Sequence, residues 1–294
     1  MEEKCTGKKE KSAIFIAILA AALYALNSPL SKLLLSSVSA TTMAGLLYLG
    51  AGAGLLIVRL IQKLLHIETN EKKLDGKDLP YTVAMVLLDV AAPIFLMIGL
   101  EHTTSANVSL LNNFEIVATS LIALVIFKEK ISKRLGVAII LVTVSSIILS
   151  VEDVSGFKFS LGSVFVILAC ICWGFENNCT RKLSEKDPLQ IVVVKGFGSG
   201  MGSLLIAYVI GEHLPELRYI LCAMAVGFVA YGLSIFFYVH AQRRLGAAKT
   251  STYYAVAPFI GVALSLIIFQ KIPSVSFWVA IVIMAMGTYL ASTE

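Results

Sequence analysis

Ten apolar runs of about 20 residues follow one another along the chain, separated by short polar or charged segments. A helix of this length spans the hydrocarbon core of a bilayer, whereas an ordinary buried helix is shorter. The runs occupy residues 12–35, 40–62, 80–101, 104–127, 133–151, 160–183, 189–211, 217–240, 248–269 and 273–292. The pattern therefore predicts an all-α polytopic membrane protein with ten transmembrane helices.

Lys and Arg residues are concentrated in alternate connections between these runs. With the N-terminus on the cytoplasmic side, 19 of the 24 Lys and Arg residues fall in cytoplasmic segments. Positive charge is enriched in cytoplasmic loops of membrane proteins. We therefore expect a multi-pass protein of the cytoplasmic membrane, in contact with the lipid bilayer, with both termini in the cytoplasm.

Composition supports the same class. The chain is 57% hydrophobic and 15% charged, with a mean hydropathy of +0.85, which is too apolar for a soluble domain. The net charge of +5 comes from loop residues and forms no basic stripe, so no nucleic-acid partner is expected. The five cysteines lack zinc-ligand spacing, and we expect neither a metal nor a cofactor.

Residues 105–130 are unusual because a predicted span carries polar side chains at its centre. Asn112, Glu115 and Thr119 have the spacing i, i+3, i+7, which places them on one helical face. A carboxylate at that depth costs about 2.5–3.5 kcal/mol, so it is tolerated mainly beside a polar cavity or a partner. We expect this face to line a cavity; the alternative is an interhelical hydrogen bond that only holds helices together.

The two halves of the chain are similar in sequence. Residues 22–57 align without a gap with residues 171–206, pairing Tyr24 with Trp173 and Asn27 with Glu176. Five spans per half is an odd number, so the second half must cross the membrane in the opposite direction to the first. We expect a cytoplasmic tail at 1–11, a first repeat at 12–151 and an inverted second repeat at 160–292, with a site between them.

Several short motifs resemble the EamA-type members of the drug/metabolite transporter superfamily. They are Tyr24-Ala25-Leu26-Asn27 through Lys32, Trp173-Gly174-Phe175 through Arg181, Thr104-Ser105-Ala106, and Phe127-Lys128-Glu129-Lys130-Ile131-Ser132. The resemblance covers nearly the whole chain as two EamA repeats. It implies a ten-helix exporter of small metabolites, with a central cavity lined chiefly by helices one, three, four, six, eight and nine.

Polar and aromatic residues on the predicted helical faces indicate such a cavity independently. The expected cavity residues are Tyr24, Asn27, Asp89, Asn112, Glu115, Trp173, Glu176, Asn177, Tyr231, Tyr238 and Tyr254. For any single tyrosine, ordinary packing or interfacial anchoring is an equally good explanation. Acidic and aromatic groups together favour a solute with an ammonium group, either an amino acid or an organic amine.

A buried carboxylate can also exchange a proton for the solute. Glu115 is the first candidate for proton coupling, followed by Asp89 and Glu176. Lys195 is expected to snorkel toward the cytoplasmic end of its span, and pairing with an acid is the alternative. Pro29, Pro93 and Pro258 fall inside spans and are candidate bending points for alternating access, with a static kink as an equally good explanation.

The leading hypothesis is thus a secondary transporter that exports a small amine-bearing metabolite, working as a monomer or homodimer. Efflux of lipophilic organic cations is the alternative within transport. A membrane-embedded enzyme is disfavoured because the chain has neither H-E-x-x-H nor G-x-S-x-G, and its four histidines lie at or beyond span ends. A receptor that binds without transport is a remaining alternative.

Overall fold

Helices account for almost all of the computed structural model, which describes residues 2–66, 71–126, 128, 131–153, 158–183, 185–245, 250 and 253–292. The first half contains α1 (Glu2–Ala25), α2 (Asn27–Leu34), α3 (Ala40–Leu64), η1 (Gly76–Asp78), α4 (Leu79–His102), α5 (Ser105–Leu111), α6 (Phe114–Val125) and α7 (Lys133–Ser150). A short hairpin of β1 (Val151–Asp153) and β2 (Lys158–Phe159) joins the halves. The second half contains α8 (Leu161–Lys182), α9 (Pro188–Val209), α10 (Leu217–Gly227), η2 (Phe228–Leu233), α11 (Ser234–Leu245), α13 (Ala257–Phe269) and α14 (Val275–Ser292).

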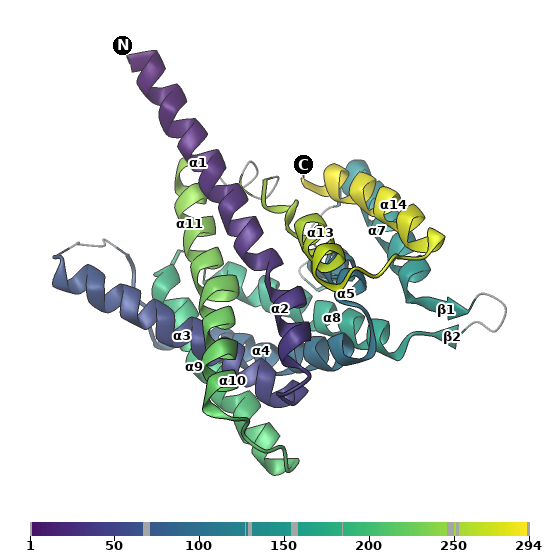
Figure 1. The fold of residues 1–294 in the computed structure, drawn as a ribbon. Helices are drawn as coiled ribbons and strands as arrows, with labels where there is room; N and C mark the ends of the chain where they lie inside the picture. Colours follow the sequence, from purple (N-terminus) through teal and green to yellow (C-terminus); the bar gives the residue numbers. More distant parts are fainter. Residues whose placement is uncertain are drawn as a thin grey trace.

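The helical segments correspond to the ten apolar runs. Over the described part of the chain, nine helical segments are long and apolar enough to cross a membrane, and α13 is a shorter apolar helix. Both chain ends lie on the same side of the bundle (Figure 1), as an even number of crossings requires. The predicted all-α, ten-helix fold is confirmed.

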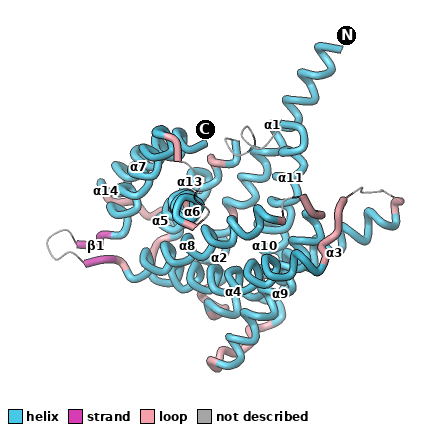
Figure 2. Tube along the Cα trace, turned by 180° about the vertical axis from the view of Figure 1, so that it is seen from behind, coloured by secondary structure: helices cyan, strands magenta, loops and turns pink. Residues whose placement is uncertain are grey.

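The way the helices pair reflects the inverted repeat. Taking the spans in chain order, the second packs on the seventh (α3 on α9), the fourth on the ninth (α5 on α13) and the fifth on the tenth (α7 on α14). The third packs on the sixth (α4 on α8), and the equivalent pair, the eighth and the first, is α11 on α1. When the two halves are exchanged, the first three of these pairs are unchanged, and the third–sixth pair becomes the eighth–first pair. The paired helices can be located in Figures 1 and 2.

Three of the spans are interrupted near the middle, where continuous helices were expected. The first breaks at Leu26, the fourth at Asn112 and Asn113, and the ninth at Ala255 and Val256. Two of the breaks come shortly before a proline. Proline lacks an N–H donor and is best tolerated in the first turn of a helix, so a new helix begins just before it. Pro29 and Pro258 accordingly lie in the first turns of α2 and α13, whereas Pro93 lies inside α4.

The break in the fourth span has a different cause, since no proline is present. There the Leu110 carbonyl oxygen accepts from the Asn113 backbone N–H at 3.2 Å, three residues ahead instead of the four of an α-helix, and also from the Asn113 side-chain amide at 3.3 Å. The eighth span contains a further irregularity, a turn of π-helix at η2. Irregular backbone at membrane depth is tolerated where it is buried in protein or lines a cavity.

Glycines allow α3 to approach its neighbours at backbone distance. A Cβ atom built on Gly50 would lie 2.0 Å from the Met224 carbonyl oxygen, and one on Gly196 would lie 2.5 Å from the Gly52 Cα atom. The glycines of α3 and α9 therefore allow these helices to pack closely. Small residues have the same role at many helix contacts in membrane proteins.

We expect Gly50→Ala to lower the thermal stability of the purified protein markedly. The new methyl group would overlap the backbone of α10, and overpacking of this kind typically costs about 1–3 kcal/mol. The matched control is Gly136→Ala in α7, where an added Cβ would have no heavy atom within 4 Å. Equal melting temperatures for the two variants in detergent would contradict the close approach of α3 and α10.

Candidate functional site

A cavity of about 580 Å³ lies between the two halves of the bundle. It reaches from Tyr48 and Glu115, deep in the bundle, to Ala291 and Ser292 at the end of α14, on the side where the chain termini lie (Figure 1). Nine of the eleven predicted cavity residues line it: Tyr24, Asn112, Glu115, Trp173, Glu176, Asn177, Tyr231, Tyr238 and Tyr254. The structure thus brings together in one space residues from both sequence halves.

Two predicted residues, Asn27 and Asp89, do not line this cavity. Asn27 lies just past the break in the first span, where its amide donates to the Tyr231 hydroxyl at 3.0 Å and its oxygen accepts from Ser31 at 3.1 Å. Asp89 is fully buried behind the cavity wall and accepts a hydrogen bond from the Tyr48 hydroxyl at 3.0 Å. Both side chains therefore position groups at the cavity wall from behind it.

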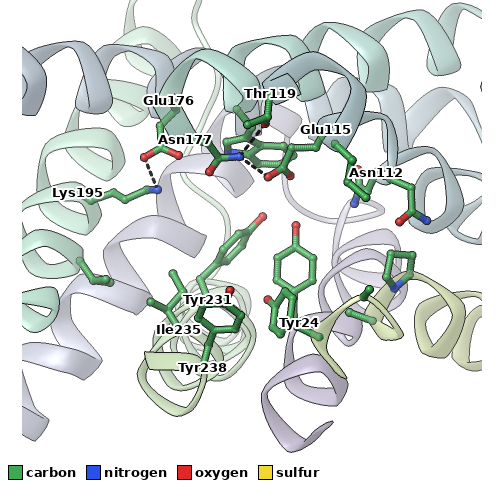
Figure 3. A pocket seen from close by; sticks show the side chains of 18 of the residues that line it. Tyr24, Asn112, Glu115, Thr119, Glu176, Asn177, Lys195, Tyr231, Ile235 and Tyr238 are labelled. Atoms are coloured by element: carbon green, nitrogen blue, oxygen red, sulfur yellow. Dashed lines mark hydrogen bonds and ion pairs between the residues drawn. The ribbon is translucent and has the colours of Figure 1, made fainter. Parts of the chain in front are cut away.

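A cluster of three charges joins α4, α8 and α9. The Lys195 ammonium lies 2.9 Å from Asp89 Oδ2. It also lies 3.0 Å from Glu176 Oε1 (Figure 3). The Thr180 hydroxyl also donates to Glu176 Oε1. The expectation that Lys195 snorkels to the surface is wrong, because burying two carboxylates in a membrane protein requires a nearby cation.

Glu115 is placed differently from the other two acids. It accepts a 2.6 Å hydrogen bond from the Asn177 amide, whose nitrogen also donates to the Thr119 hydroxyl at 3.3 Å (Figure 3). Within the described residues, no Lys or Arg forms an ion pair with Glu115, and no cluster of His, Cys, Asp or Glu is suited to a metal ion. Its carboxylate therefore faces the cavity with an amide partner and without a cation.

Tyrosine rings form the opposite wall. Tyr24 stands edge-on to Tyr231 with ring centroids 6.0 Å apart, and Tyr238 stands edge-on to Tyr254 at 5.0 Å. Tyr24 also contacts Tyr254 at 5.9 Å, which joins the two pairs into one aromatic surface. In Figure 3 the Tyr24 and Tyr231 rings point toward Glu115 and Asn177 across the open space. The faces and edges of such rings can contact a cation held at the carboxylate.

The model of the EamA-like transporter family matches residues 11–151 and 160–293, which is nearly the whole chain. The chain belongs to the EamA-like transporter family. The resemblance drawn from the sequence motifs is thereby confirmed.

Relatives and solved structures agree with this EamA-like assignment. An uncharacterized transporter from Methanothermobacter thermautotrophicus is 25% identical over 292 residues, covering 94% of this chain and 85% of the relative. The uncharacterized transporter YyaM from Bacillus subtilis is 22% identical over 177 residues, which is 57% of this chain and 58% of YyaM. A crystal structure with 17% identity superposes with a TM-score of 0.66 over 95% of both chains and shows that the fold is shared. These names indicate a multi-pass membrane transporter and leave its solute open.

Sequence reasoning on this EamA-like chain missed Tyr48 as a cavity residue. Tyr48 lies among glycines and leucines of α3, lines the cavity, and stacks near Tyr231 at 5.3 Å. Nothing in its immediate sequence sets it apart from an interfacial tyrosine. Its position became visible only because Gly50 and Gly52 draw α3 into the centre of the bundle. The acidic residue Glu129, part of the family motif after the fourth span, lies outside the described residues.

Proposed function

We propose that the protein is a secondary active transporter that exports amino acids or related small amine-bearing metabolites by alternating access. The observation that carries this proposal is the carboxylate of Glu115, which lines an aromatic cavity and has no cationic partner among the described residues. An ammonium group placed there would gain a charge-assisted hydrogen bond and contact with the tyrosine wall.

The balance of charge around the cavity supports a cationic group on the solute. Three carboxylates, those of Asp89, Glu176 and Glu115, share one ammonium, that of Lys195. With all groups ionised, the cluster that Lys195 forms with the first two keeps one net negative charge, and Glu115 adds a second that has no ion-pair partner among the described residues. A volume of about 580 Å³ lies within the range of small-molecule sites, about 300–1,000 Å³.

Alternating access requires a cavity that is closed on one side. On the side away from the termini, α5 and α13 meet at a hydrogen bond of 2.8 Å between the hydroxyls of Ser105 and Ser265. The distribution of Lys and Arg favours cytoplasmic termini in a cytoplasmic membrane, so the open side would face the cytoplasm. A cavity that loads from the cytoplasm is the expected starting state of an exporter.

A second candidate is efflux of lipophilic organic cations. Its support is the large aromatic and aliphatic part of the lining, which includes Trp173, Ile116 and Ile235. Both candidates require a positive charge on the solute, and they differ in whether a carboxylate accompanies it.

The test of the proposed class is a binding panel on the purified protein. Phenethylamine should raise its melting temperature, whereas the uncharged analogue phenylpropanamide should have little effect. In Glu115→Gln the response to phenethylamine should fall about tenfold in apparent affinity, the usual worth of one charge-assisted hydrogen bond. Equal responses to the amine and the amide would reject the proposal that the cavity selects for positive charge.

A further inference from the structure

A second cavity, of about 560 Å³, lies on the side of the bundle away from the termini. We call it the outer cavity; no residue that lines it also lines the first cavity. It is formed where α2, the end of α4, the start of α5 and the connection between α13 and α14 come together. Hydroxyl groups are frequent in its wall, among them those of Thr103, Ser105, Ser265 and Ser274.

The charges at the outer cavity are opposite in sign to those at the first cavity. Lys32 and Lys271 both line it, together with a single acidic residue, Glu101. The Lys32 ammonium donates to the backbone carbonyls of Leu100 and Glu101, the latter at 3.1 Å. Within the described part of the chain, no carboxylate forms an ion pair with either lysine. With two lysines and one glutamate, the lining of the outer cavity carries a net positive charge when all three groups are ionised.

A narrow polar seam separates the two cavities. A void of about 10 Å³ lies in this seam and shares Tyr24, Asn112 and Pro258 with the lining of the first cavity. Ser109 and Gly261 line the void and lie one helical turn from Ser105 and Ser265, which line the outer cavity. The Ser265 hydroxyl donates to the Gly261 carbonyl oxygen at 2.7 Å.

Two buried oxygen atoms in this seam have no hydrogen-bond partner among the described residues. They are Ser109 Oγ and Asn112 Oδ1, in side chains that are 3% and 8% exposed. Leaving a buried polar atom unpaired costs free energy, so each such atom needs an explanation, such as a polar molecule that binds beside it. The seam between α2, α5 and α13 thus places unpaired oxygen atoms between the first cavity and the outer cavity.

We infer that the outer cavity is a second solute site, in which Lys271 and Lys32 bind the carboxylate of the solute. The same solute binds earlier in the first cavity, with its ammonium group near Glu115. This inference rests on the proposed function and narrows its substrate class to zwitterions such as amino acids. A solute with only a positive charge would meet a net positive cavity on leaving, whereas a zwitterion presents a complementary group to each cavity in turn.

Binding at the two cavities can be distinguished with three aromatic probes of similar size: phenylalanine, phenethylamine and phenylpropanoate. The informative variant is Lys271→Gln, because Lys271 is exposed and makes no described contact on which folding depends. We expect this variant to weaken phenylpropanoate binding about threefold to fivefold, as the loss of an exposed charge pair should, and to leave phenethylamine binding unchanged. Lys271→Arg should restore the binding. Lys133→Gln, an exposed lysine at the start of α7, is the control and should match the unmodified protein.

The complementary variant is Glu115→Gln, which should weaken the binding of phenethylamine and leave the binding of phenylpropanoate unchanged. Both variants should weaken the binding of phenylalanine. If phenylpropanoate binds equally well to the protein with and without Lys271, the outer site is overturned while the amine site stands. If phenethylamine binding does not depend on Glu115 but phenylpropanoate binding depends on Lys271, the proposed amine site fails and the anion site stands. Absence of binding by all three probes would overturn both.

Discussion

Replacing Lys195 by Gln should strongly destabilise the protein, lowering both its yield from membranes and its melting temperature in detergent. The substitution leaves Asp89, which is fully buried, and Glu176, which is 2% exposed, without their shared cation. Removing one partner from a buried ion pair typically costs about 3–5 kcal/mol, because the remaining charge cannot be hydrated. That is a large share of the stability of an ordinary domain.

The control for this prediction removes the charges together. The triple variant Asp89→Asn, Glu176→Gln, Lys195→Gln has no buried charge to compensate, so it should recover most of the stability that the single variant loses. Lys195→Arg, which keeps the charge, should also lose less than Lys195→Gln. A single variant that melts at the same temperature as the unmodified protein would show that the three groups do not form a buried cluster.

The fold could be predicted from the sequence because each crossing leaves an independent signal. A helix that crosses a membrane must be predominantly apolar over about 20 residues, so each span can be recognised without knowledge of its neighbours. The inverted arrangement followed from the odd number of spans in each half. The interruptions in the spans were harder to predict. Pro29 and Pro258 mark two of them, but no proline marks the break at Asn112 and Asn113, where the Leu110 carbonyl oxygen accepts from both the backbone N–H and the side-chain amide of Asn113.

The site was predicted less completely, because the partners of a polar side chain depend on which helices become neighbours. The tyrosines and Glu115 were found since helical spacing alone places them on inward faces. Lys195 and Asp89 are 106 positions apart on different helices, and their contact of 2.9 Å follows from the packing of α4 and α9. Nothing in the sequence around Lys195 or Asp89 shows whether Lys195 extends to the membrane surface or forms ion pairs with two buried acids.

Replacing Glu115 by Gln should abolish transport driven by a pH gradient while leaving solute exchange detectable. Glutamine keeps the size of the side chain and can still accept the hydrogen bond that the Asn177 amide donates at 2.6 Å. It can neither carry a negative charge for an ammonium group nor take up a proton in exchange for it. One carboxylate that binds either a proton or a cationic solute, but not both, couples their movements in opposite directions.

The measurement uses proteoliposomes that contain the full chain, with phenylalanine inside and outside for exchange and with an imposed pH gradient for net flux. The gradient-driven flux should disappear in Glu115→Gln, whereas exchange at saturating phenylalanine should persist, because Tyr24, Tyr231 and Tyr254 still form the wall. Glu185→Gln, which removes an exposed carboxylate that does not line the cavity, is the matched control and should transport normally. A variant that retains the full gradient-driven flux would show that Glu115 does not carry the proton. The coupling group would then have to be sought at Asp89 or Glu176, where Lys195 already competes for the charge.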